Sequence, residues 1–211
     1  MELVVTRISE IDAHGAKSNL DYMVENDRES FDVFTKNCYK RLNISYPKFY
    51  KMDRLSKLCF IGTEILLHDH KRFEQYDREK ICVILENYHS SIDTDIKHFE
   101  SIKSREEYFP SPAIFVYTLP NIMLGEICIR HHIQGESSCF LPQEGEKDFI
   151  KNYISALFLN ENYDCCIAGK VDYFEEVYES KLYLIEKRDL VEKHILKFDS
   201  IFNVKKYGCI D

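Results

Sequence analysis

Hydrophobic residues in this chain follow two spacings that alternate along the sequence. Short apolar runs bounded by charged residues, such as residues 81–85, are typical of strands buried on both faces. Longer segments place apolar residues three and four positions apart, as from Met52 to Leu66, which is the spacing of one helical face. The pattern predicts strands at residues 3–8, 81–85, 137–141, 164–169 and 181–186. It predicts helices at residues 29–40, 52–68, 94–102, 120–132, 144–159 and 191–198.

The order of these elements predicts the fold class. Strands that alternate with helices indicate an α/β protein with a mainly parallel central sheet and helices on both faces. The sequence contains no internal repeat and no low-complexity linker. We therefore expect residues 1–211 to form a single domain.

Charge and hydropathy exclude several classes of protein. The formal net charge of −8 argues against nucleic-acid binding, which needs a basic surface. No apolar run reaches the ~18–20 residues that a membrane span requires. The residues after Met1 do not have the basic and apolar pattern of a signal peptide. We expect a cytoplasmic protein without a membrane span.

Cysteine and histidine give no sign of a metal site. Most of the eight cysteines lie inside apolar runs, where a reduced thiol behaves as a small hydrophobic side chain, and none forms a C-x-x-C pair. The pairs His68/His70 and His131/His132 fall at predicted helix ends, where cations are favourable. The chain has neither a Gly-rich phosphate loop after a strand nor a G-x-S-x-G motif. We expect no cofactor and no metal.

The carboxyl ends of the predicted strands are the natural place for a ligand in an α/β fold. His89 follows the strand at residues 81–85, and Asn121 begins the helix at residues 120–132. A pocket around these two side chains would suit a non-enzymatic binding module.

A set of motifs between residues 46 and 172 carries a resemblance to a known family. They are Tyr46-Pro47-Lys48-Phe49-Tyr50-Lys51-Met52-Asp53-Arg54, Ser111-Pro112-Ala113-Ile114-Phe115, Tyr117-Thr118-Leu119-Pro120-Asn121, Gly125-Glu126-Ile127-Cys128-Ile129-Arg130, Gly135 and Asp164-Cys165-Cys166-Ile167-Ala168-Gly169-Lys170-Val171-Asp172. In order and rough spacing they resemble the amino-terminal half of β-ketoacyl-acyl-carrier-protein synthases, of the thiolase-like superfamily. The resemblance implies a thiolase-like half fold of the short bacterial type.

The resemblance also implies where the chemistry would lie. In that family a nucleophilic cysteine opens a buried helix, where the helix dipole and backbone N–H groups stabilise the thiolate. Counting forward from Gly135 and back from Gly169 places that position at Glu144, with Gln143 beside it. Neither can carry an acyl thioester. Cys139 is the nearest cysteine and lies five residues earlier, about 16 Å away along a strand.

Three hypotheses follow. The first is a half-length, catalytically degenerate partner of a full-length synthase or acyl carrier protein in fatty-acid, polyketide or aryl-polyene-type lipid assembly. By resemblance it would form a homo- or heterodimer through the strand at residues 137–141. The second is an active 3-oxoacyl-acyl-carrier-protein synthase or malonyl-thioester decarboxylase, which uses Cys139 or Glu144 and residues of a partner subunit. The third is the binding module around His89 and Asn121.

Overall fold

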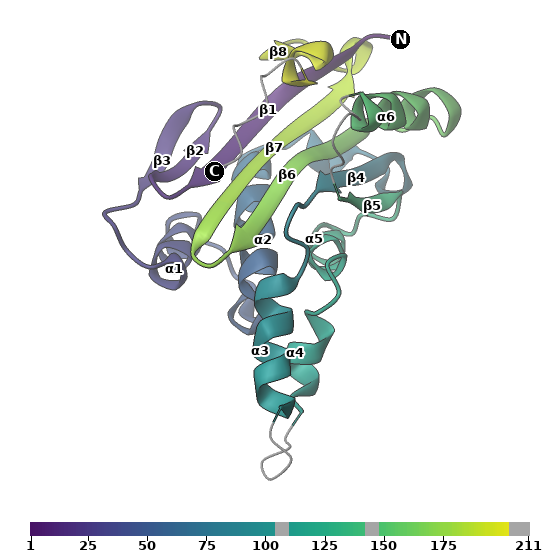
Figure 1. Ribbon diagram of the computed structural model, residues 1–211. Helices are drawn as coiled ribbons and strands as arrows, with labels where there is room; N and C mark the ends of the chain where they lie inside the picture. The colour runs from purple at the N-terminus through teal and green to yellow at the C-terminus, as the bar shows by residue number, and fades with distance from the viewer. Residues whose placement is uncertain (104–109, 142–147, 203–211) are drawn as a thin grey trace.

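A central sheet with helices on both faces forms the body of this computed structural model (Figure 1). The structure describes residues 1–103, 110–141 and 148–202. The described strands are β1 (Leu3–Asp12), β2 (Gly15–Ser18), β3 (Asp21–Glu25), β4 (Ile81–Glu86), β5 (Ser137–Phe140), β6 (Cys165–Phe174), β7 (Val177–Lys187) and β8 (Leu196–Lys197). The described α-helices are α1 (Phe31–Arg41), α2 (Arg54–Leu67), α3 (Ile92–Ile102), α4 (Pro112–Val116), α5 (Ile122–His131) and α6 (Phe149–Asn160).

The sheet has the strand order β3-β2-β1-β7-β6-β4-β5, and β8 pairs with β1. β4 runs parallel to both of its neighbours, β5 and β6. β7 is antiparallel to β6 and to β1, so β1 points in the same direction as β6. In the centre of the sheet, β1, β4, β5 and β6 thus run in one direction and β7 runs in the other. This arrangement confirms the predicted α/β class. Among the described strands only the β4–β5 and β4–β6 pairings are parallel and the other pairings are antiparallel, so the sheet is mixed and not mainly parallel as expected.

A tight turn explains why β7 reverses direction. β6 ends at Phe174 and β7 begins at Val177, so only Glu175 and Glu176 connect them. Both have positive φ, 47° and 65°, as a two-residue hairpin turn requires. Such turns usually contain Asn or Gly, and neither is present here. The sequence therefore gave no turn signal, and the predicted strands at 164–169 and 181–186 were too short.

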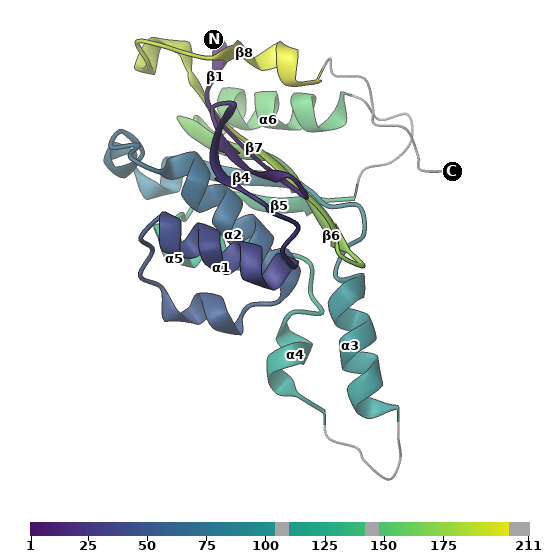
Figure 2. The ribbon, with the colours of Figure 1, turned by 90° about the vertical axis from the view of Figure 1, so that its left-hand side faces the viewer.

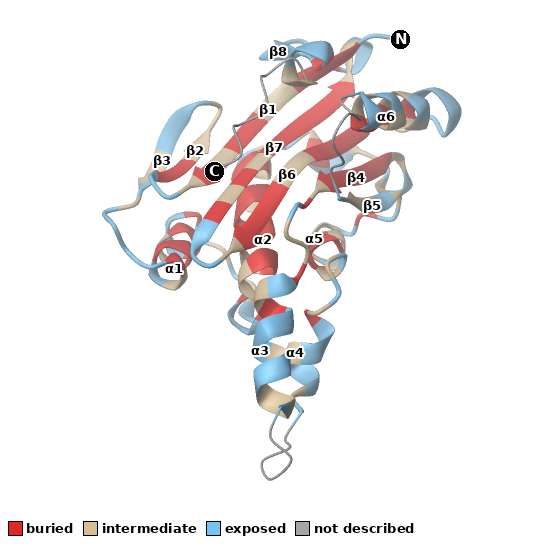
Figure 3. Cartoon of the chain, in the orientation of Figure 1, coloured by how far each residue is buried: buried red, intermediate tan, exposed pale blue. Residues whose placement is uncertain are grey.

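The sheet separates two hydrophobic cores. Along β4, Val83 and Leu85 face the layer formed by α1, α2 and α5, whereas Cys82 and Ile84 face α6. This alternation is the two-residue period of a strand that is buried on both faces. Figure 2 shows α6 on one side of the sheet and α1, α2 and α5 on the other. Figure 3 shows the buried positions running through the central strands and along α2.

α2 lies close against the sheet at Gly62. A Cβ atom at this position would stand 2.7 Å from Ser180 Oγ and 3.1 Å from Leu182 Cδ1, both on β7. The Gly62 carbonyl also accepts a 2.8 Å hydrogen bond from Ser9 Oγ on β1. The absence of a side chain here lets the helix approach two strands that are far apart in sequence.

The predicted helix at residues 191–198 is wrong. This segment contains the short strand β8 and then a 3₁₀ helix, Phe198–Phe202. β2 pairs with β1 only from Ser9 onward, which leaves the backbone at the start of β1 available on that side. β8 pairs there, with Leu196 opposite Val5. Backbone pairing at a free strand edge thus outweighs the helical spacing.

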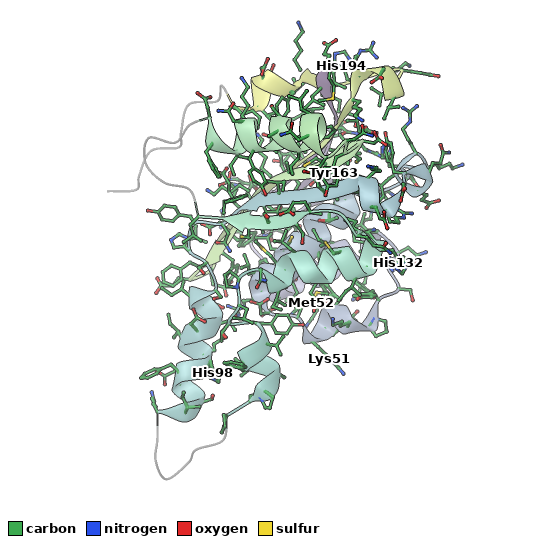
Figure 4. The ribbon with its side chains drawn as sticks, turned by 90° about the vertical axis from the view of Figure 1, so that its right-hand side faces the viewer. Lys51, Met52, His98, His132, Tyr163 and His194 are labelled. Carbon is green, nitrogen blue, oxygen red and sulfur yellow. The ribbon has the colours of Figure 1, made fainter. Side chains whose placement is uncertain are left out.

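The helices α1, α2, α3, α5 and α6 were predicted, with changes at their ends, whereas α4 was not. α5 ends at His131, and His132 terminates it in the left-handed conformation, with φ 57° (labelled in Figure 4). Pro112, expected in a rigid loop, is the first residue of α4, and Ser111 Oγ accepts from Ile114 N. The β2–β3 hairpin, which is polar and half exposed, was not predicted.

α3 and α4 extend from one end of the body as a two-helix projection (Figures 1 and 2). Their bases are held by hydrogen bonds to the body. Asp53 Oδ1 accepts from Ser56 N and so caps α2, and its Oδ2 accepts from Thr94 Oγ1 on α3 at 2.8 Å. Burial raises the pKa of Asp53, although the hydrogen bonds from Ser56 and Thr94 oppose that effect.

Candidate functional site

The carboxyl ends of the three parallel strands meet at one edge of the sheet. Glu86, the last residue of β4, pairs in register with Phe140 of β5 and with Lys170 of β6. The chain leaves β4 toward α3 and leaves β5 toward α6, while β6 continues for four more residues. This is the edge at which an open α/β fold places its ligands.

His89 is held at this edge by Asp172. The backbone N–H of His89 donates to Asp172 Oδ1 at 2.9 Å, and its Nδ1 lies 2.7 Å from Asp172 Oδ2. Because the carboxylate accepts, Nδ1 is the donor, and Nε2 of the neutral ring is left as the acceptor. The ring stacks on Phe174 at 5.2 Å between centroids, and Tyr88 contacts its face edge-on. Strand β6 therefore fixes both the tautomer and the orientation of a partly exposed imidazole.

Asn87 links β4 to β5 beside this pair. Its side chain is fully buried, its N–H donates to the Phe140 carbonyl at 3.0 Å, and Nδ2 donates to the Ser90 carbonyl. Among the described residues its Oδ1 is a buried acceptor without a hydrogen-bond partner. A buried, unpaired acceptor is unfavourable by roughly 1–3 kcal/mol unless something donates to it.

The positions that the family resemblance singled out lie between β5 and α6. Gln143 and Glu144 fall within residues 142–147, outside the described part of the chain. On either side of that segment, the rings of Phe140 and Phe149 lie 5.1 Å apart. Tyr153, one turn further along α6, lies 5.0 Å from Phe140. The end of β5 and the start of α6 are thus packed together, but the assignment of Glu144 remains a prediction.

Cys139 lies on the opposite face of the sheet from α6. Its side chain is half buried and packs against the core formed with α2 and α5, whereas its neighbour Phe140 packs against the core formed with α6. Burial raises the pKa of its thiol to about 11, so the thiol is protonated near neutral pH. A catalytic role for this cysteine remains a prediction that the geometry does not favour.

The structure also places the other residues that the sequence analysis named. Asn121 precedes α5 but its side chain makes no capping bond. His131 Nε2 lies 3.2 Å from Glu64 Oε1, and His70 Nε2 lies 3.9 Å from Glu186 Oε2. All seven described cysteines are free thiols, and most of them are buried. No group of His, Cys, Asp or Glu among the described residues is arranged to bind a metal ion.

Asp172 ends the last of the resemblance motifs, but the sequence assigned it no role at this site. The strand was expected to end at residue 169, so Asp172 had no assigned place next to His89. In the sequence, Asp172 is a carboxylate three residues beyond Gly169. Only the continuation of β6 past the end of β4 shows that the two side chains meet.

None of the described helices combines the length and the apolar composition that crossing a bilayer requires.

Comparison with known proteins identifies the fold. No protein-family model matches the chain, and no curated protein matches it in sequence. Among solved structures, the ishigamide ketosynthase/chain length factor has a TM-score of 0.67 at 15% identity, with 92% of this chain and 64% of that chain covered. A type II PKS acyl-carrier protein in complex with its ketosynthase bound to the hexaketide has a TM-score of 0.62 at 11% identity, with 90% and 63% covered.

A third similar structure is the ketosynthase ApeO in complex with its chain length factor ApeC, from Xenorhabdus doucetiae. Its TM-score is 0.53 at 12% identity, and the alignment covers 89% of this chain and 79% of that chain. The present chain spans less than two thirds of the matched chains in the first two structures. The thiolase-like fold of ketosynthases and chain length factors, predicted from the sequence, is confirmed.

Proposed function

We propose that this chain is a chain-length-factor-like partner of a full-length ketosynthase in acyl-carrier-protein-dependent assembly of a polyketide or a related lipid. The observation that carries the proposal is the third comparison. There, nearly all of this chain aligns with most of a chain from a ketosynthase–chain length factor complex. That structure contains a ketosynthase in complex with its chain length factor, and this chain would take the place of one of the two.

The candidate site supports the role of a partner subunit that does not itself transfer acyl groups. The only cysteine of β5 is half buried, has a raised pKa and packs on the side of the sheet away from α6. The position that matches the family nucleophile holds Glu144, which cannot form a thioester. Catalysis would then belong to the ketosynthase, and this chain would shape or support its site.

β5 supports an interface at the edge of the sheet. It ends the strand order, so within the described residues its outer edge pairs with no other strand. An exposed strand edge is a template for pairing with a second chain. We propose that the partner ketosynthase, or a second copy of this chain, pairs there.

Co-expression tests the partner role. We expect the chain to co-purify with a full-length ketosynthase of the same organism as a 1:1 complex of defined mass, measured by light scattering after gel filtration. Intact-protein mass spectrometry with acyl-loaded carrier protein should then show the adduct on the ketosynthase alone. Failure to form a complex with any ketosynthase of the organism would refute the partner role, and a stable adduct on Cys139 would refute the non-catalytic role.

A second candidate function is ligand binding at His89. It is favoured by the fixed His89–Asp172 pair and by the unpaired buried acceptor of Asn87. A His89→Ala variant would lose binding of such a ligand but would leave the ketosynthase complex intact. That difference, measured by gel filtration of the complex, separates the two functions.

A further inference from the structure

His89 differs from two other histidines that lie near a carboxylate. In His131 the ring nitrogen that faces the carboxylate, that of Glu64, is Nε2, and this atom is buried. The same holds for Nε2 of His70. In His89 the nitrogen that faces the carboxylate is Nδ1, 2.7 Å from Asp172 Oδ2. None of the described residues hydrogen-bonds to Nε2 of His89, and this atom is not buried.

Asp172 fixes the tautomer that a base requires. Its carboxylate accepts from Nδ1–H, so the neutral ring of His89 keeps its lone pair on Nε2. Asp172 is buried, and its other oxygen accepts from the backbone N–H of His89, so both of its oxygens are engaged. A proton taken up by Nε2 would place the charged ring beside this buried carboxylate, where attraction between charges is strong. Enzymes orient a general base by the same arrangement of carboxylate and imidazole.

Apolar side chains lie around His89. Phe174 stacks on its ring, and Tyr88 contacts the ring edge-on and is 63% exposed. Val177, which pairs with Phe174 between β6 and β7, is 70% exposed. Ile92, whose N–H donates to the His89 carbonyl, is also exposed. We call Tyr88, Ile92, Phe174 and Val177 the His89 shelf. It is a surface on which an aliphatic chain could bury apolar area.

We propose that His89 is the general base of a hydrolytic site, which cleaves acyl thioesters whose aliphatic chain lies on the His89 shelf. The inference deepens the second candidate function, and the choice of a thioester rests on the proposed role in acyl-carrier-protein-dependent assembly. The hydrolysis is separate from the acyl transfer assigned to the ketosynthase.

The reaction needs only water as a second reactant. Nε2 of His89 removes a proton from a water molecule while the water oxygen bonds to the thioester carbonyl carbon. The C–S bond then breaks, its electron pair leaves on the sulfur, and the imidazolium returns the proton to that sulfur. The products are a carboxylic acid and a free thiol. Asp172 touches neither reactant and is a positioning residue.

Hydrolysis of octanoyl-N-acetylcysteamine by the full chain tests the proposal, with the released thiol measured by a colour reaction. His89→Ala and His89→Gln should each lower kcat about a hundredfold, the lower end of what a general base contributes. Thermal melting of both variants checks that the loss of activity is not a loss of folding. The matched control is His194→Ala, which removes an exposed histidine before β8 (labelled in Figure 4) and should leave kcat unchanged.

Asp172→Asn tests the positioning role. The amide of the new side chain would donate to Nδ1 of His89, so the ring proton would move to Nε2 and the basic lone pair would be lost. We expect kcat to fall as far as in His89→Ala, while KM stays the same. Nitrogen NMR of the ring should show the proton on Nδ1 in the wild-type chain and on Nε2 in the variant. A loss of activity with the proton still on Nδ1 would overturn the role of Asp172.

The remaining outcomes separate this inference from the partner role. A wild-type chain that hydrolyses the thioester no faster than His89→Ala overturns the inference, whether or not a ketosynthase co-purifies. Equal loss of activity in His194→Ala, or cleavage of the oxygen ester p-nitrophenyl octanoate alone, overturns it as well. A chain that hydrolyses the thioester through His89 but binds no ketosynthase supports the inference and refutes the partner role.

Discussion

α2 and α3 have the same kind of apolar spacing but opposite surroundings. On α2 ten residues are buried, including Leu58, Phe60 and Ile61, and the helix lies between the sheet and two other helices. On α3 only Thr94 is buried, and three of its four apolar residues, Ile92, Ile96 and Phe99, are exposed. The two helices are joined near their amino-terminal ends by the hydrogen bond between Asp53 and Thr94.

The difference shows that apolar periodicity predicts a helix but not what the helix contacts. For α2 the apolar residues extend around the helix, so the sheet can cover one side and α1 and α5 the others. For α3 the narrow apolar stripe lies opposite a side that can make hydrogen bonds, and those bonds orient it. Buried apolar area stabilises α2 in the fold, whereas the exposed apolar side chains of α3 contribute little to the stability of the chain.

The largest predicted effect compares the same substitution on the two helices. Phe60→Ala on α2 removes a fully buried ring and should lower the free energy of unfolding by about 4 kcal/mol. Phe99→Ala on α3 should change it by less than about 0.5 kcal/mol, since the ring is mostly exposed. Urea denaturation followed by circular dichroism measures both. Similar losses for the two variants would mean that α3 is packed in solution.

A smaller effect is expected from the close approach of α2 to β7. Gly62→Val would force a side chain against Ser180 and Leu182 and should cost about 3 kcal/mol. Gly125→Ala on α5 is the control, because a Cβ atom there meets nothing within 4 Å. It should stabilise by about 0.5–1 kcal/mol, the difference in helix propensity. Thermal melting would contradict the packing at Gly62 if both variants were neutral.

The link between α2 and α3 should contribute less. Asp53→Ala removes the cap of α2 and the acceptor of Thr94, and should cost about 2 kcal/mol. Thr94→Val keeps the shape but leaves the carboxylate without that donor, and should cost about 1 kcal/mol. In a double-mutant cycle we expect a coupling of about 1 kcal/mol. Strict additivity would show that this hydrogen bond does not hold α3 to the body.

The smallest effect is a pH dependence on the other side of α2. Burial alone would raise the pKa of Glu64, but hydrogen bonds from His131 and Arg130 hold it below the ordinary value of 4.5. A carboxyl whose pKa is lowered by folding stabilises the native state above that value, and the contribution is lost as pH falls through the lowered pKa. Glu64→Gln should therefore cost about 1 kcal/mol at pH 7 and progressively less below pH 4. A difference that does not change with pH, in parallel urea titrations, would contradict this.

Much of the fold could be predicted from the sequence, and each miss has a physical cause. α2 and β4 are defined by apolar residues whose spacing is unambiguous, and both were placed to within a few residues. The β6–β7 turn at Glu175 and Glu176 and the strand β8 were missed. The turn was missed because it contains neither Asn nor Gly, and β8 because it depends on pairing with β1, which is distant in sequence.

The candidate site was predicted less completely. His89 at the end of β4 followed from its position after a buried apolar run. Its partner Asp172 lies 83 positions later and is brought to it only because β6 continues past β4. Cys139 and Glu144 are only five residues apart in the sequence. In the structure, however, Cys139 packs on the face of β5 that lies away from α6.

The sequence by itself determined the α/β class and the buried segments, because these depend on residue identity and local spacing. Tertiary structure alone decided the direction of β7, the meeting of His89 with Asp172 and the outward orientation of α3. The direction of β7 depends on a two-residue turn without Asn or Gly, and the other two depend on hydrogen bonds from residues distant in sequence. Asp53 and the Thr118 carbonyl turn the polar side of α3 inward, and the apolar stripe is exposed as a result.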